Sequence, residues 1–376
     1  MSFFISTSSL MIFAILPIFL KEVLGASTLK IGLMEGVAIG ASFLAKFFAG
    51  LLSDRWRTRK PFILLGTTGS FLTRLLFPIA TSVGFVFWTR FADRISKGVR
   101  SAPTDALIAD LAHENYRGKG FGLRQALYTL GAAFGASLAT VLMLSSNNDY
   151  RLVFWSASIA AFLSLAILIV FVRPSEQENT HKPTTRWRLK DIKLLPISYW
   201  KALAVITLLM LARFSELFLP LKAKDIGWSI ASLPLLIAFM DVIHAGVAYP
   251  IGNLADKRSR KKLLFLGMLM FVVAHLVLMR ADTILLSILG IGLLGLHMGM
   301  TQGLIKTLLI EDIPFELRGT AFGIFNLASG IAILIANTLA GYLADIWGIS
   351  ASFAGGAVFA AAACGLLILF NLRRTA

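Results

Sequence analysis

Long apolar runs separated by short polar segments make up most of this chain. A membrane core of roughly 30 Å needs about 20 helical residues, so each run can be compared with that length. Twelve runs match it, and they lie near residues 3–22, 29–52, 61–80, 84–108, 119–144, 151–172, 199–221, 229–252, 262–279, 283–309, 318–343 and 350–371. The pattern predicts an all-α integral membrane protein with twelve transmembrane helices.

Two segments decide how these helices are grouped. The first run begins next to Met1 but lacks the basic start and the small-residue cleavage site of a signal peptide, so we expect a retained helix. The longest polar segment, Arg173 to Lys193, has prolines, mixed charge and no apolar period. We therefore predict a six-helix bundle at 1–172, a cytoplasmic linker at 173–198 and a second six-helix bundle at 199–376.

Composition agrees with a membrane location. Hydrophobic residues make up 57% of the chain and charged residues 15%, and the mean hydropathy is +0.78, far from the average of a soluble domain. The single cysteine, Cys364, lies in an apolar run, so no disulfide within one chain and no thiol pair for a metal is expected.

The cationic residues are unevenly distributed between the two sides of the predicted membrane. With the chain start assigned to the cytoplasm, the inner connections hold 20 Lys and Arg and the outer connections hold 6. This positive-inside bias predicts a multi-pass protein of the cell inner membrane with both termini in the cytoplasm. It also means that much of the net charge of +16 reflects topology, and we expect no nucleic-acid partner.

Three landmarks recur half a chain apart. The loop GLLSDRWRTRK, Gly50 to Lys60, returns as GNLADKRSRKK, Gly252 to Lys262, and RGKGFG at Arg117 returns as RGTAFG at Arg318. Asp110 and Asp312 repeat at the same spacing as the loop. Parallel repeats of a six-helix unit are typical of transporters.

At these residues the chain resembles the major facilitator superfamily (MFS), whose signature loop reads roughly G-x-L-A-D-R-x-G-R-K between helices two and three. DRISKGVRSAPTDALIAD, Asp93 to Asp110, also resembles the fourth helix of bacterial permeases in this superfamily. Arg57 and Thr58 depart from the loop pattern, and helix five lacks the proline of the antiporter motif. Drug export is therefore not implied by motif.

The repeated loop can act as a conformational latch, an expectation to which the resemblance contributes. Asp54 can meet the positive end of a neighbouring helix or an arginine, while the cations beside it contact headgroups and acidic partners. The alternative is that these cations only set topology. The latch residues are Gly50, Asp54, Arg55, Arg59 and Lys60 in the first copy, and Gly252, Asp256, Lys257, Arg260 and Lys261 in the second.

Charges inside a membrane helix are costly unless they face protein or water. On the predicted fourth helix, the charged side chains fall within an arc of roughly 140° at about 100° per residue. This face and other buried cations predict an anion-binding interior, formed by Arg90, Asp93, Arg94, Lys97, Arg100, Arg124, Arg213 and Lys306. The alternative is an interhelical ion-pair network without a ligand.

The stretch ISTSSLMIFAILPIFL of the first helix contains no acidic residue, so if protons couple transport another carboxylate must carry them. The candidates are Glu216, Asp241 with His244 on the same helix face, and Asp105. Arg213 and Glu216 could instead form a simple i, i+3 helical pair. His275 and His297 are expected to be packed polar residues.

These features together predict a secondary active transporter that moves a small organic, anionic solute by alternating access, coupled to protons. The alternatives are a multidrug-type efflux permease and a transport-inactive receptor or scaffold with the same fold. We expect a monomer in the lipid bilayer that is not an enzyme and binds no cofactor and no metal.

Overall fold

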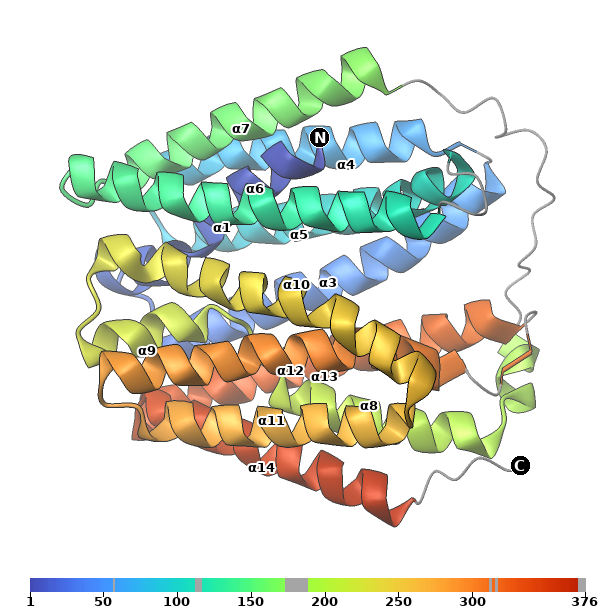
Figure 1. Ribbon diagram of the computed structural model, residues 1–376. Coiled ribbons are helices and arrows are strands. Elements are labelled where there is room, and N and C mark those ends of the chain that lie inside the picture. Colours follow the sequence, from blue (N-terminus) through green and yellow to red (C-terminus); the bar gives the residue numbers. More distant parts are fainter. Residues whose placement is uncertain (57, 112–116, 173–188, 311–312, 315–316, 371–376) are drawn as a thin grey trace. The chain divides into compact units, whose positions relative to one another are not determined.

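The computed structural model describes residues 1–56, 58–111, 117–172, 189–310, 313–314 and 317–370. Within these residues the regular structure is helical and contains no strand. The chain forms two compact units (Figure 1). Unit 1 comprises residues 1–27, 37–184 and 229–238, and unit 2 comprises 28–36, 185–228 and 239–376. The domain boundaries drawn at the linker remain a prediction.

Unit 1 contains the helices of the first predicted bundle. They are α1 (Ser2–Phe13), α2 (Leu16–Ile18) with the π-helix η1 (Phe19–Val23), most of α3 (Thr28–Arg55), α4 (Lys60–Leu76) with η2 (Phe77–Ile79), α5 (Val83–Leu111), α6 (Arg117–Ser145) and α7 (Tyr150–Phe171). Helix α1 packs on α6 and α7, and α4 packs on α5 and α7. The α4 and α5 pairing positions the charged face of α5.

Unit 2 contains the helices of the second predicted bundle. They are η5 (Leu189–Leu194), α8 (Ile197–Ala212), α9 (Phe218–Ile226), most of α10 (Leu233–Lys257, preceded by η6, Ile230–Ser232), α11 (Arg260–Arg280), α12 (Ile284–Ile310), α13 (Arg318–Trp347) and α14 (Ile349–Leu369). Helix α11 packs on α12 and α14, and α8 packs on α13 and α14.

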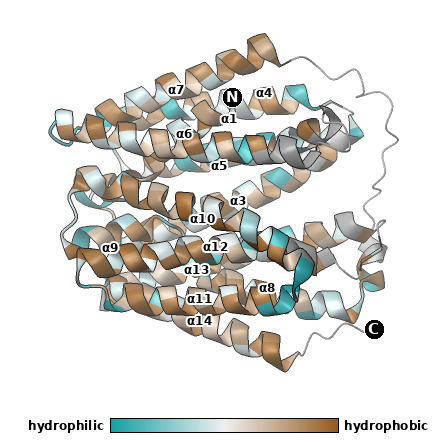
Figure 2. Cartoon of the chain, in the orientation of Figure 1, coloured by the Kyte–Doolittle hydropathy of each residue, from teal (hydrophilic) through white to brown (hydrophobic). Residues whose placement is uncertain are grey.

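Ten helices in the described part of the chain are long and apolar enough to cross a membrane. The other two predicted spans coincide with α5, which carries the charged face, and with the pair α8 and α9. Colouring by hydropathy shows mostly apolar residues along α7 and α14 (Figure 2). The all-helical membrane fold is confirmed, while the count of twelve depends on how these two spans are treated.

The predicted continuous helix over 199–221 is wrong, because the chain leaves helical geometry between α8 and α9, from Arg213 to Leu217. Pro220 lacks an N–H for the Glu216 carbonyl, and its ring crowds that carbonyl in a continuous helix. The Ser215 N–H instead donates to the Asn337 Oδ1 on α13, at 2.8 Å. The break is thus held by a neighbouring helix.

Close helix contacts fix α5 within unit 1. A Cβ at Gly66 on α4 would collide with the Ser96 carbonyl and the Arg100 backbone of α5. A Cβ at Gly98 on α5 would collide with the Ser42 carbonyl of α3. Glycine at these positions lets the backbones approach closely, as is common between membrane helices.

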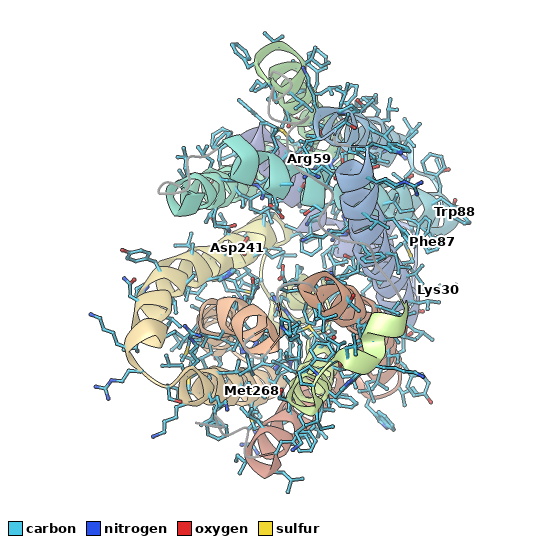
Figure 3. All side chains as sticks on the ribbon, turned by 90° about the vertical axis from the view of Figure 1, so that its right-hand side faces the viewer. Lys30, Arg59, Phe87, Trp88, Asp241 and Met268 are labelled. Atoms are coloured by element: carbon cyan, nitrogen blue, oxygen red, sulfur yellow. The ribbon has the colours of Figure 1, made fainter. Side chains whose placement is uncertain are left out.

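The opposite face of α5 is apolar. Trp88 is 64% exposed, and Figure 3 shows Trp88 and Phe87 pointing away from the helices of unit 1. Helix α5 therefore has an aromatic face suited to lipid and a charged face toward the protein.

Candidate functional site: a buried cationic cluster on helix five

The charged face of α5 is largely withdrawn from solvent. Arg90, Asp93 and Arg100 are 3%, 3% and 8% exposed, and Arg94 and Lys97 are half-buried. Three of the five charged residues are thus buried, and the anion-binding role of this face stays a prediction. Arg74 of α4, 2% exposed, also belongs to this cluster.

Asp93 is the carboxylate that these cations share. Its Oδ1 lies 2.7 Å from the Arg74 Nη1, and its Oδ2 lies 3.5 Å from the Arg90 Nη1. Arg94, Lys97 and Arg100 also interact electrostatically with it. Five cations therefore surround this carboxylate in a low-dielectric region.

Arg74 belongs mainly to the architecture of unit 1. Its Nε donates to the Ser8 Oγ at 3.1 Å, and its Nη2 donates to the Ser9 Oγ at 3.1 Å. Together with the ion pair to Asp93, these bonds join α1, α4 and α5. The ion-pair network considered as an alternative is therefore present for this part of the cluster.

Arg90 and Arg94 share an aromatic neighbour. Their guanidinium carbons lie 5.2 and 5.5 Å from the centre of the Phe13 ring on α1. At such distances the ring face attracts cations and reduces the cost of their desolvation. Sequence reasoning did not include Phe13 in the site. A polar stretch ending in an aromatic residue, STSSLMIF, was the available signal.

Two other predicted residues form a pair of their own. Arg124 of α6 forms an ion pair and a hydrogen bond with Asp105 of α5, and both side chains are partly exposed. The sequence pattern assigned Arg124 to substrate and Asp105 to proton coupling, and the structure brings the two together. Arg100 donates to the Ser70 Oγ of α4, so this cation is also fixed by a neighbour.

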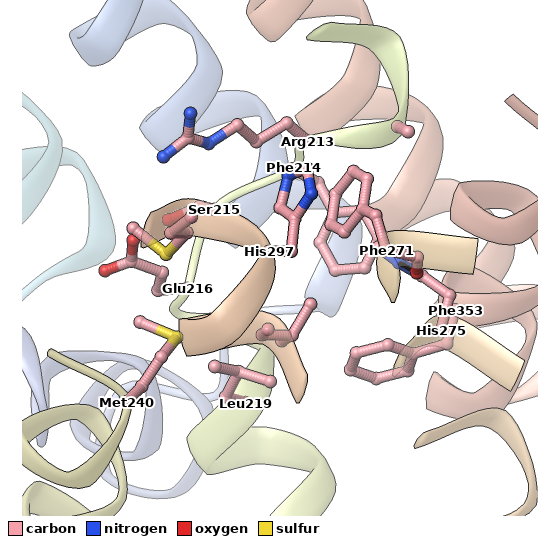
Figure 4. Close-up of a pocket in the computed structure, with 13 residues that line it drawn as sticks. Arg213, Phe214, Ser215, Glu216, Leu219, Met240, Phe271, His275, His297 and Phe353 are labelled. Carbon is pink, nitrogen blue, oxygen red and sulfur yellow. Dashed lines mark hydrogen bonds between the residues drawn. The ribbon is translucent and has the colours of Figure 1, made fainter. Parts of the chain in front are cut away.

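The predicted residues of unit 2 gather at the helix break. Arg213 and Glu216 line one pocket with His297, and Arg213 also interacts electrostatically with His244 of α10 (Figure 4). Arg213 and Glu216 interact electrostatically, as in the pair that we considered as an alternative, but residues 213–215 are not helical. Asp241 is half-buried on α10. The Lys306 side chain lies outside the described part of the structure.

His275 and His297, which we expected to be packed polar residues, are buried and line the same pocket. They are 2% and 1% exposed, and each places Nδ1 at a backbone carbonyl, that of Phe271 at 2.9 Å and that of Gly267 at 2.8 Å.

The latch residues are described only in part. The Arg59 Nη1 donates to the Ser53 Oγ at 3.0 Å, which ties the loop to the end of α3. A Cβ at Gly50 would lie 3.4 Å from the Ala102 Cβ of α5, and a Cβ at Gly252 would meet no atom within 4 Å. Arg55 and Lys257 are exposed, and Lys60, Arg260 and Lys261 are half-buried. The Asp54 and Asp256 side chains lie outside the described part of the structure, so the latch stays a prediction.

Two helical units with many apolar spans and a buried cationic face define a multi-pass membrane protein built for solute transport. The sequence model of the Major Facilitator Superfamily matches residues 1–336 and 202–376. The chain belongs to this family of transporters, whose members are not enzymes.

The relatives and structural neighbours agree. An uncharacterized MFS-type transporter of Methanocaldococcus jannaschii is 30% identical over 383 residues, covering 98% of this chain and 92% of that protein. The inner membrane transport protein YajR of Escherichia coli is 24% identical, covering 93% of this chain and 77% of that protein. The crystal structure of the human organic anion transporter MFSD10 (TETRAN) has a TM-score of 0.69 and 16% identity, and 97% of each chain is covered. That structure supports the fold alone.

Proposed function

We propose that this protein is a secondary active transporter of a small organic anion, working by alternating access with proton coupling. The observation that carries the proposal is the arrangement of five cations around Asp93 in unit 1. A fixed positive field in a low-dielectric interior favours negatively charged cargo.

Arg94 and Lys97 are the residues that we assign to the cargo. Arg74 is bonded to Ser8, Ser9 and Asp93, while Arg94 and Lys97 are only half-buried on the same helix face. A guanidinium offers a planar fork to a carboxylate or phosphate, and a lysine adds a mobile point charge. Arg94 lies about ten residues from the outer end of α5, or roughly 15 Å along the helix, which is near the middle of a membrane core.

Binding of organic acids to purified protein tests this assignment. A panel of mono- and dicarboxylates and phosphorylated compounds is screened by calorimetry, and Arg94→Gln is compared with the exposed Arg151→Gln. Loss of the buried charged contact should weaken binding by about 2–4 kcal/mol in Arg94→Gln, while Arg151→Gln should bind like the wild type. A cationic cargo, or unchanged affinity in Arg94→Gln, would show that the cluster is purely structural.

Proton coupling is assigned to Glu216 and Asp241, with His244 nearby in charge interaction with Arg213. Their amide variants should abolish accumulation driven by a pH gradient in proteoliposomes. Counterflow exchange should persist, because exchange needs no net proton movement. If both Glu216→Gln and Asp241→Asn still accumulate cargo against its gradient, the proton site lies elsewhere. If the wild type transports nothing, the scaffold alternative is favoured.

A further inference from the structure

The break between α8 and α9 borders a pocket that lies entirely within unit 2. Its empty space is about 420 Å³, including the open side. Eight of its 13 lining residues are apolar, among them Phe214, Phe271, Phe353, Leu219, Met240 and Met298. The lining comes from α8, α9, α10, α11, α12 and α14 and from the segment between α8 and α9. Figure 4 shows Arg213 and Glu216 on one side of the pocket and the rings of Phe271 and Phe353 on the other, with His297 between them.

The aromatic wall is arranged for another ring. Phe214 lies edge-to-face with Phe353 at a centroid distance of 5.3 Å and with His275 at 5.5 Å. Phe271 and His297 are stacked nearly parallel, 3.9 Å apart. Aromatic rings prefer such edge-to-face and stacked contacts. A planar ring that enters the pocket can therefore make the same kinds of contact with these side chains. Met240 and Met298 add polarizable sulfur at its border.

His297 places a hydrogen-bond acceptor in this apolar surrounding. Its Nδ1 faces the Gly267 carbonyl at 2.8 Å, and since a carbonyl can only accept, this nitrogen carries the proton. In the neutral ring Nε2 is then an acceptor. Among the described residues, none donates a hydrogen bond to this nitrogen, although the side chain is 1% exposed. A buried acceptor of this kind favours an occupant with an O–H or N–H donor.

Arg213 supplies the third element of recognition. It lines the same pocket, and Figure 4 shows its side chain on the same side as Glu216. An arginine beside an apolar pocket suits a carboxylate attached to a ring that is buried deeper.

We propose that this pocket binds aromatic carboxylates with a meta hydroxyl, with the ring among the phenylalanines, the carboxylate at Arg213 and the hydroxyl donating to the Nε2 of His297, which lies between them. The site belongs to unit 2 alone. It shares no residue with the cluster on α5. Equilibrium binding to this pocket can therefore be measured whether or not the α5 cluster holds the transported anion.

The test uses 3-hydroxybenzoate and 3-methylbenzoate as probes, because a methyl group has the size of a hydroxyl but cannot donate. Calorimetry on the purified full-length protein should give at least about tenfold tighter binding for 3-hydroxybenzoate than for 3-methylbenzoate. In His297→Phe, which keeps a ring for the stack with Phe271, the two affinities should become equal. Equal affinities in the wild-type protein, or no binding of either acid, would overturn the proposal without touching the anion assignment of α5.

A pair of variants on one helix controls for location. Leu294→Trp fills the pocket and should abolish binding of 3-hydroxybenzoate. Leu289 lies on the same helix and is 52% exposed, so Leu289→Trp should bind the acid like the wild type. Undiminished binding in Leu294→Trp would place the acid elsewhere and reject the pocket. The two-probe comparison on the wild type requires no variant to fold.

Discussion

Asp93 lies at the point where the cationic side chains of unit 1 meet. It pairs with Arg74 and Arg90 and is 3% exposed. The desolvation free energy of two buried charges is offset by their mutual attraction only when both are present. A single buried charge loses its hydration without that attraction. We therefore separate Asp93 and Arg74, which hold the helices together, from Arg94 and Lys97, which we assign to cargo.

The first prediction follows from this division. Asp93→Asn should lower folding stability by about 3–5 kcal/mol, since it leaves the neighbouring arginines uncompensated. Thermal unfolding of the detergent-purified protein measures the effect. The double variant Arg74→Gln with Asp93→Asn should lose less unfolding free energy than the two single variants lose in sum, because it removes both members of a coupled pair. Strict additivity of the two losses would contradict the coupling.

At the scale of the helix, Gly66 determines where the charged face of α5 lies. Its missing side chain allows α4 to contact the Ser96 carbonyl and the Arg100 backbone directly. Gly252, in the second copy of the signature loop, has no atom within 4 Å of a Cβ and is exposed. The two glycines therefore differ in what a side chain would meet.

Gly66→Leu should separate α4 from α5 and destabilise unit 1 by about 1–3 kcal/mol, the usual range for overpacking. Gly252→Leu should change the melting temperature little, because its side chain enters open space. Thermal unfolding of both variants in the same detergent checks this difference. An equal loss in Gly252→Leu would indicate that the second loop packs against a part of the chain outside the described residues.

Much of the fold could be predicted from hydrophobic length and repetition, since a membrane permits few alternatives to helices. The shared face of α5 was also predictable, because helical periodicity places Arg90 and Arg94 together. The helix break could not be found from length, since residues 199–221 are apolar enough to span. Pro220 was a local signal, but the bond from Ser215 to Asn337 joins positions 122 residues apart. The pairing of Arg124 with Asp105 likewise could not be predicted, because it depends on how α6 packs against α5.

At the scale of the whole molecule, the distribution of cations defines an orientation that can be tested. The inner connections hold 20 Lys and Arg against 6 in the outer connections. Cytoplasmic loops of membrane proteins retain such an excess, so Ser145 should face outward and Ser259 inward. Both serines are exposed: Ser145 is the last residue of α6, and Ser259 directly precedes α11.

A cysteine at each serine reports on this orientation with little change in shape. The natural protein offers a low background, because its single cysteine, Cys364, is buried. A membrane-impermeant maleimide should label Ser145→Cys in intact cells and should label Ser259→Cys only after permeabilisation. Wild type and a Cys364→Ala background should remain unlabelled in intact cells. The reverse labelling pattern would place both termini outside and would mean that the cations on α5 are approached from the opposite side of the membrane.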